Sequence, residues 1–162
     1  MLLHSKPKYM SLTAQTILVT GGTGYIGSHT VVQLLEAGSK VVILDNLCNS
    51  KRSVLQRVGR IAGRMPTFHE ADVRDRAALR RIFAAQRIDA VIHFAALKAV
   101  GESFERPLDY FDNNISGTIA LLRAMRAADV GRLVFSSSAT VYGEPQSVPI
   151  DEDGIPRWEL IE

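Results

Sequence analysis

The chain has 162 residues, of which 46% are hydrophobic and 22% charged, the length and composition of one ordinary globular domain. A net charge of +2 is too small to indicate nucleic acid or a membrane surface, and no apolar run approaches the roughly 20 residues of a membrane span. We therefore expect neither a nucleic-acid partner nor a membrane partner. The single cysteine, Cys48, excludes an internal disulfide and fits a reducing, cytoplasmic location.

Residues 1–15 contain lysines but no apolar centre of a signal peptide, so we expect a flexible extension. After them, short apolar runs alternate with longer stretches of helical periodicity. The predicted strands are Thr16–Thr20, Lys40–Leu44, Thr67–Ala71, Asp89–Phe94 and Arg132–Ser136. The predicted helices are Tyr25–Ala37, Arg52–Gly63, Arg76–Gln86 and Pro107–Asp129. Because the strands are apolar at consecutive positions, we expect helices to cover both faces of their sheet.

This alternation predicts an α/β fold, a Rossmann-type doubly wound parallel sheet that is truncated after about five strands. From Gly143 to Pro156 the sequence becomes rich in acidic and turn-forming residues. We therefore expect one dinucleotide-binding domain over 16–153, a divergent tail over 154–162 and no substrate domain.

A glycine-rich string lies between the first predicted strand and the first predicted helix. It reads Thr20-Gly21-Gly22-Thr23-Gly24-Tyr25-Ile26-Gly27. Gly21 and Gly24 permit a tight turn and a close approach of the backbone to a pyrophosphate, and Gly27 lets helix and strand pack closely. The pyrophosphate would lie at the helix N-terminus, where the dipole favours an anion. This context favours a dinucleotide site over a plain structural turn.

Asp45 follows the second predicted strand, about 20 residues after the glycines. A carboxylate at that position accepts hydrogen bonds from the adenosine ribose hydroxyls and repels a 2′-phosphate, which favours NAD over NADP. The alternative interpretation is an aspartate that caps a helix.

Two further strand ends carry candidate residues, and both leave alternatives open. Asp72, after the third strand, is interpreted either as a partner of the adenine amine or as a solvated turn residue. After the fourth strand, the small residues Ala95 and Ala96 would let a cofactor lie against the backbone. Lys98 then adds a positive charge near the phosphates or ribose, or is simply exposed.

The fifth strand ends in three serines, Ser136 to Ser138, of which one is placed to bond a reacting substrate oxygen. A serine-rich turn that satisfies its own backbone is the alternative. The last predicted helix is apolar enough to be core or a dimer face, and Asn113 is its polar exception. The four histidines have no spacing typical of metal ligands, so we expect no metal site.

Longer strings around these positions resemble the UDP-glucose 4-epimerase family of the extended short-chain dehydrogenase/reductase superfamily. The superfamily resemblance rests on the glycine string, and the resemblance covers roughly residues 16 to 153. The family resemblance rests on Asp45-Asn46-Leu47-Cys48-Asn49-Ser50, His93-Phe94-Ala95-Ala96-Leu97-Lys98-Ala99-Val100-Gly101-Glu102-Ser103 and Ser136-Ser137-Ser138-Ala139-Thr140-Val141-Tyr142-Gly143.

The resemblance implies a cofactor site for NAD and a role for each matching residue. Tyr25 and Ile26 would line the pyrophosphate turn, and Asp72 and Val73 would flank the adenine. Ser138 would assist catalysis at the sugar 4-hydroxyl. The remaining implied cofactor residues are Asp45, Asn46, Leu47, Cys48, Asn49, Ser50, Phe94, Ala95, Ala96, Leu97, Lys98 and Asn113.

The implied reaction is oxidation and re-reduction at C4 of a UDP-hexose, which interconverts UDP-galactose and UDP-glucose without net redox change. The implied intact enzyme is a homodimer, an assembly that we do not expect to carry over directly to this chain. The general acid–base of the family, a Tyr-x-x-x-Lys motif, is expected beyond the last residue, so we expect the chain alone to be inactive. The alternatives are a stand-alone or remnant NAD-binding module and another NAD-dependent nucleotide-sugar oxidoreductase.

Overall fold

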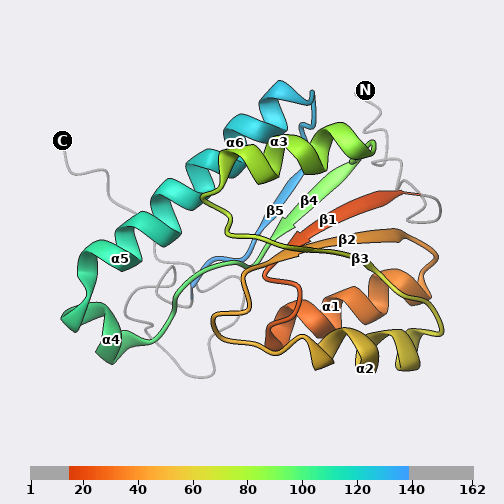
Figure 1. Ribbon diagram of the computed structural model, residues 1–162, viewed down its shortest axis with the longest axis horizontal. Helices are drawn as coiled ribbons and strands as arrows, with labels where there is room; N and C mark the ends of the chain where they lie inside the picture. Colours follow the sequence, from red (N-terminus) through yellow and green to blue (C-terminus); the bar gives the residue numbers. More distant parts are fainter. Residues whose placement is uncertain (1–14, 139–162) are drawn as a thin grey trace, which may run out of the picture.

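A computed structural model describes residues 15–138, which form one five-stranded parallel sheet flanked by helices (Figure 1). The elements are β1 (Thr16–Thr20), α1 (Tyr25–Glu36), β2 (Lys40–Asp45), α2 (Ser53–Ala62), β3 (Thr67–Glu70), α3 (Arg76–Ala85), β4 (Ala90–His93), α4 (Val100–Glu105), α5 (Pro107–Phe111), η1 (Asp112–Ser116), α6 (Gly117–Ala127) and β5 (Leu133–Phe135). The predicted Rossmann-type sheet of five strands is confirmed.

The strand order is β3-β2-β1-β4-β5, and every neighbouring pair is parallel. The chain builds outward from β1 to β3 on one side and then crosses back to place β4 and β5 on the other. The direction of winding therefore reverses between β1 and β4. In open α/β sheets, ligands bind at such a reversal, outside the carboxyl ends of the strands.

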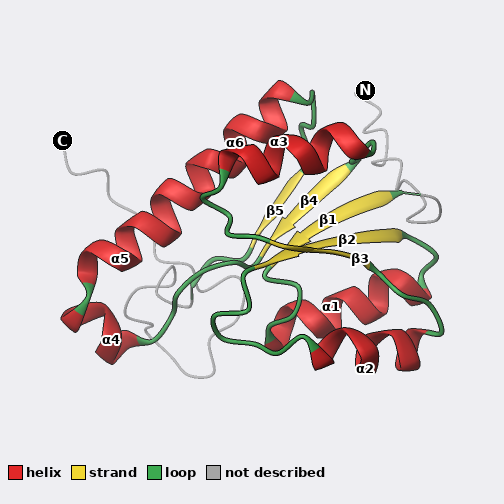
Figure 2. Ribbon diagram, viewed as in Figure 1, coloured by secondary structure: helices red, strands yellow, loops and turns green. Residues whose placement is uncertain are grey.

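Helices cover both faces of the sheet, α1 and α2 one face and α3 and α6 the other (Figure 2). Along β1, Leu18 belongs to one buried apolar cluster while Ile17 and Val19 belong to the other. Successive side chains of a strand point to opposite faces, so a strand between two helical layers needs apolar residues at consecutive positions. The continuous apolar runs of the sequence have this cause.

The predicted helix Pro107–Asp129 differs from the observed one. It begins at Pro107 and is helical through Ala127, but Asp112 to Ser116 form a π-helical segment between α5 and α6. The short helix α4, whose six residues are all at least partly exposed, lies in a segment for which no helix was predicted. Because α4 has no buried face, its sequence lacks the repeated apolar spacing of three and four residues by which a helix is predicted.

The two faces of this long helical segment have different roles. Leu121 and Met125 are buried in the core, as expected of one alternative, whereas Phe111 and Leu122 are exposed. None of the helices in residues 15–138 is long and apolar enough to cross a membrane. The predicted extension, apart from Gln15, and the predicted tail 154–162 lie outside the described residues.

Candidate functional site: a dinucleotide-binding crevice

The glycine turn after β1 depends on two positions that exclude a side chain. Gly21 has a φ of +69°, and a Cβ built on it would lie 2.7 Å from the backbone nitrogen of Ala95. A Cβ on Gly27 would collide with the carbonyl oxygen of Gly21. The turn therefore packs against the chain that leaves β4, and the first turn of α1 packs against the glycine turn. The packing role predicted for Gly27 is observed.

The N-terminus of α1 faces this turn without a side-chain cap. Its N-cap residue is Gly24, and no acidic residue lies in the first turn. By contrast, the Asp75 carboxylate caps α3 and accepts hydrogen bonds from the amides of Ala77 and Ala78. A helix N-terminus without a side-chain cap, beside a glycine turn, fits the pyrophosphate of a dinucleotide.

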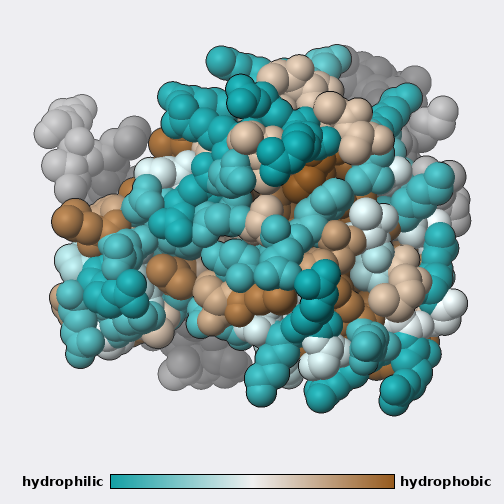
Figure 3. All heavy atoms as spheres, in the orientation of Figure 1, coloured by the Kyte–Doolittle hydropathy of each residue, from teal (hydrophilic) through white to brown (hydrophobic). Residues whose placement is uncertain are grey.

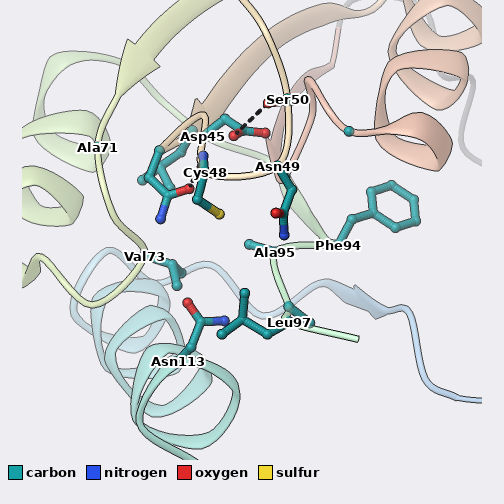
Figure 4. Close-up of a pocket in the computed structure, with 15 residues that line it drawn as sticks. Asp45, Cys48, Asn49, Ser50, Ala71, Val73, Phe94, Ala95, Leu97 and Asn113 are labelled. Carbon is teal, nitrogen blue, oxygen red and sulfur yellow. Dashed lines mark hydrogen bonds between the residues drawn. The ribbon is translucent and has the colours of Figure 1, made fainter. Parts of the chain in front are cut away.

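Asp45 is buried at the end of β2 and joins that strand end to the glycine turn. One carboxylate oxygen, Oδ2, accepts the amide of Thr23 at 3.0 Å, and Oδ1 accepts the amide of Leu47 at 2.9 Å. Ser50 Oγ donates to Oδ1 at 3.4 Å (Figure 4). Asp45 is therefore not a helix cap, since the N-cap of α2 is Arg52. It organises the loop after β2 and lines the cavity.

A cavity opens at the carboxyl ends of β1 to β4, where the topology predicts a ligand (Figure 4). The Cys48 thiol and the side-chain amides of Asn49 and Asn113 point into it. Its wall consists of Gly21, Gly24, Leu44, Asp45, Asn46, Cys48, Asn49, Ser50, Ala71, Val73, Phe94, Ala95, Ala96, Leu97 and Asn113. The structure thus brings together residues from five separate segments of the chain that were predicted to share a cofactor site.

Other predicted site residues lie around this cavity rather than in its wall. Tyr25 and Ile26 are exposed on the first turn of α1, and Leu47 adopts a left-handed φ of +59° inside the loop after β2. Leu44 and Ala71, which line the cavity, were not predicted as site residues. Each comes one position before a predicted one, so their place at the ends of β2 and β3 was the available signal.

Asp72 is neither a wall residue nor a freely solvated turn residue. Both of its carboxylate oxygens accept hydrogen bonds from the Arg74 guanidinium, at 2.8 Å each. These contacts hold the pKa of Asp72 well below its usual range, although partial burial acts in the opposite direction. The carboxylate is therefore ionised and fixed in orientation at neutral pH.

A second cavity, of about 290 Å³, lies on the β5 side and shares Ala95, Ala96 and Leu97 with the first. Lys98 and Ser138 both line it. The Lys98 ammonium lies 3.4 Å from the carbonyl oxygens of Ser136 and Ser137, so this lysine is drawn to the end of β5. The chain segment after β4 consequently separates a cavity that contains Asp45 from a cavity that contains Ser138.

His93, buried at the end of β4, lines this second cavity and bonds two hydroxyl groups. Its Nδ1 lies 2.6 Å from Thr20 Oγ1, and its Nε2 lies 3.0 Å from Thr118 Oγ1. The Thr118 hydroxyl donates its hydrogen to the carbonyl oxygen of Asn114, so it accepts from Nε2–H, and Nδ1 accepts from Thr20. Burial, aided by the Lys98 charge, lowers the pKa of His93 to about 4.

Asn114 is a residue that the sequence analysis missed. Its Oδ1 accepts the amide of Leu97 at 2.8 Å, and its Nδ2 donates to the Leu97 carbonyl at 2.9 Å. The segment after β4 has no regular structure to pair its backbone, so this side chain supplies both hydrogen bonds. The available signal was a pair of adjacent asparagines, Asn113 and Asn114, within a predicted helix.

Residues 17–157 match the family described as "NAD dependent epimerase/dehydratase family", which is most of the chain. The chain belongs to this family.

Curated relatives and solved structures place it near one branch of the family. A UDP-glucose 4-epimerase of Yersinia pestis is 63% identical over 136 residues, which are 84% of this chain and 40% of the relative. A UDP-glucose 4-epimerase structure from Stenotrophomonas maltophila, with bound NAD and formylated UDP-arabinopyranose, is 57% identical with a TM-score of 0.82, covering 86% of this chain and 42% of that one.

A second structure, the Bifidobacterium longum UDP-glucose 4-epimerase in complex with NAD+ and UDP, is 49% identical with a TM-score of 0.82. The matched region is 86% of this chain and 42% of that structure's chain. The chain thus spans about 40% of the length of the first curated relatives that it matches. What these members of the epimerase/dehydratase family share with the chain is the half that contains the glycine turn and both cavities.

Proposed function

We propose that this chain is the NAD-binding part of a UDP-glucose 4-epimerase. The observation that carries the proposal is the wall of the first cavity, in which the glycine turn, the Asp45 loop and Asn113 converge beside the uncapped N-terminus of α1. Bound there, NAD would supply reversible hydride acceptance at C4 of a UDP-hexose, so that UDP-galactose and UDP-glucose interconvert without net redox change.

Each end of the crevice suits a different part of the cofactor. At the first cavity, the Asp45 carboxylate retains acceptor capacity beside its hydrogen bonds to the Thr23 and Leu47 amides, which fits ribose hydroxyls and opposes a 2′-phosphate. The second cavity is lined by Ser138 and Lys98, of which Ser138 would bond the sugar 4-hydroxyl and Lys98 would add positive charge. The shared wall of Ala95 to Leu97 is where the two halves of the cofactor would meet.

The test is calorimetric titration of the 162-residue chain with NAD and with NADP. We expect NAD to bind more tightly, and NAD at about 100 times its Kd to add about 2.7 kcal/mol to the free energy of unfolding. Asp45→Asn should reduce the preference because it removes the negative charge. Asp129→Asn is the matched control, since Asp129 lies after α6 at a φ of +55° that asparagine also adopts. Equal affinities, or tighter binding of NADP to the parent chain, would reject the proposal.

A second expectation concerns turnover. No Tyr-x-x-x-Lys string occurs in the 162 residues, so this polypeptide alone lacks the acid–base pair that the family resemblance implies. A positioned acid–base group contributes about 10²- to 10⁴-fold, and orientation of the substrate contributes several kcal/mol more. In a coupled assay for UDP-glucose formation with added NAD, we expect activity many orders of magnitude below that of a full-length relative. Turnover within about tenfold of such a relative would show that another group performs the proton transfer.

A further inference from the structure

Four side chains form a continuous polar bridge beside the first cavity. Asn46 Nδ2 donates to Asp72 Oδ2 at 3.0 Å, and the guanidinium of Arg74 binds both Asp72 oxygens. Arg74 Nη1 then reaches Asp112 Oδ2 at 2.7 Å. This Arg74 bridge, made of Asn46, Asp72, Arg74 and Asp112, ties the loops after β2 and β3 to the π-helical segment η1.

The residues next to the bridge form the cavity wall. Asn46 lines the cavity itself, Val73 lies between Asp72 and Arg74, and Asn113 follows Asp112. Val73 also packs directly on α6, because a Cβ at Gly117 would come within 2.6 Å of Val73 Cγ1. The Arg74 side chain therefore joins the two chain segments that place Val73 and Asn113 in the cavity wall.

The bridge also determines how Asp72 presents its carboxylate. Oδ1 accepts the Arg74 amide and Nε, and Oδ2 accepts Arg74 Nη2 and Asn46 Nδ2. A carboxylate has about four lone-pair positions, so all are occupied. Three of the four donors belong to Arg74. The Asn46 amide is the donor that a ligand amine can replace without disturbing the arginine.

Arg74 also separates two negative charges, those of Asp72 and Asp112. The side chains of Arg74 and Asp112 are 41% and 56% exposed, so these ion pairs add little to the free energy of unfolding. Their geometry is nevertheless specific, because a planar guanidinium holds one carboxylate by two parallel hydrogen bonds while it contacts another. The arrangement indicates a role in positioning rather than in global stability.

We propose that Arg74 is a positioning residue for the adenine end of the cofactor site, acting through Asp72 and through the helix that carries Asn113. The inference rests on the proposed function, since it assumes that a dinucleotide places its base between the loop after β3 and η1. With the bridge intact, the Asp72 carboxylate accepts the adenine amine in place of Asn46, and Val73 contacts the ring.

The experiment compares NAD with nicotinamide hypoxanthine dinucleotide, in which a carbonyl oxygen replaces the adenine amine. A carboxylate accepts a hydrogen bond from the amine but repels the carbonyl oxygen, so we expect the parent chain to prefer NAD by about tenfold. In Arg74→Ala, the ratio of the two Kd values should fall to about one, because the carboxylate is no longer held. Arg76→Ala, which removes the same charge from an exposed neighbour without a bond in the bridge, should keep the parent ratio.

Asp112→Asn provides a second variant that keeps the Asp72–Arg74 pair and weakens the attachment to η1. If Arg74→Ala does not fold, Asp112→Asn should still lower the ratio, by about twofold to threefold. A parent ratio near one, or an unchanged ratio in the folded variants, would overturn the inference and leave NAD binding intact. Failure of the parent chain to bind either dinucleotide would instead reject the proposed function.

Discussion

His93 shows how strongly one side chain depends on its surroundings. The ring is buried, and both nitrogens are hydrogen bonded to threonine hydroxyls on different elements, Thr20 on β1 and Thr118 on α6. The Thr118 hydroxyl has already given its hydrogen to Asn114, so a neutral ring with hydrogen on Nε2 satisfies every partner. A protonated ring would have two donors and would face Thr20 with a hydrogen that has no acceptor unless that hydroxyl turns.

This environment predicts a pH dependence of stability. The pKa of His93 is about 4 in the folded chain, against 6.5 for an ordinary histidine, so the unfolded state binds the extra proton between these values. Its contribution to stability is fully present above pH 6.5 and is lost as the pH falls toward 4. Between about pH 7.5 and about pH 4.5, the parent chain should lose about 2–3 kcal/mol more unfolding free energy than His93→Gln.

Urea unfolding at the two pH values measures this difference. His29→Gln is the control for the substitution itself, because it replaces an exposed histidine on α1. An identical loss of unfolding free energy in the parent and in His93→Gln would show that the buried ring takes up its proton without cost.

Single residues also show where sequence reasoning stopped. Asp45 ends β2 and Asp72 follows β3, and the sequence left a structural alternative open for each. The distinction depends on partners that lie far apart in the chain, such as Thr23 for Asp45 and Asp112 for Arg74. Periodicity and local spacing carry no information on such pairs.

At the scale of elements, the predictable parts were those with a local physical cause. All five strands were predicted, with bounds that differ from the observed ones by at most a few residues. The apolar runs of β1 and β2 have a clear physical cause, because these strands are buried on both faces. The glycine turn was predictable because Gly21 and Gly27 occupy positions where a Cβ cannot fit. α3 begins after Asp75, a capping residue whose side chain bonds two amides of the first turn.

The π-helical segment η1 was not predictable in this way. An inserted residue changes the hydrogen-bond register of a helix without changing its composition, and such insertions often occur at functional sites. Here, adjacent asparagines serve different partners, since Asn113 lines the first cavity and Asn114 binds the Leu97 backbone. The chain segment after β4, which separates the two cavities, is thus held by η1. The irregular hydrogen bonding of η1 is visible only in the structure.

At the scale of the whole molecule, apolar side chains emerge over the end that carries α4 and α5 (Figure 3). Exposed apolar residues follow one another at spacings of three and four along the continuous helix from α5 to α6. We name this surface the apolar stripe, and it consists of Leu108, Phe111, Ile115, Ile119 and Leu122. The opposite side of the same helix packs on the core through residues such as Leu121 and Met125.

The stripe favours one arrangement, in which a second copy of the chain covers it. A helix with one apolar side buried in the core and another exposed is typical of association. An isologous pair would place two such helices against each other, each burying the same side chains. The exposed Val134 and Phe135 on β5, at the edge of the sheet formed by the described residues, are a second apolar surface that we expect to contribute less.

We therefore predict that the chain self-associates and that Leu108→Glu shifts it toward monomer. A glutamate at this end of the stripe would place an unpaired charge against the apolar side chains of the partner helix, which costs more than any compensating hydration. Ile61→Glu is the matched control, because Ile61 is an exposed apolar residue of the same size as Leu108 but lies on α2, outside the stripe. In sedimentation velocity, the parent and Ile61→Glu should associate at concentrations where Leu108→Glu does not. A monomeric parent would contradict the predicted self-association. Association that Val134→Glu abolishes and Leu108→Glu leaves unchanged would place the contact at the sheet edge instead.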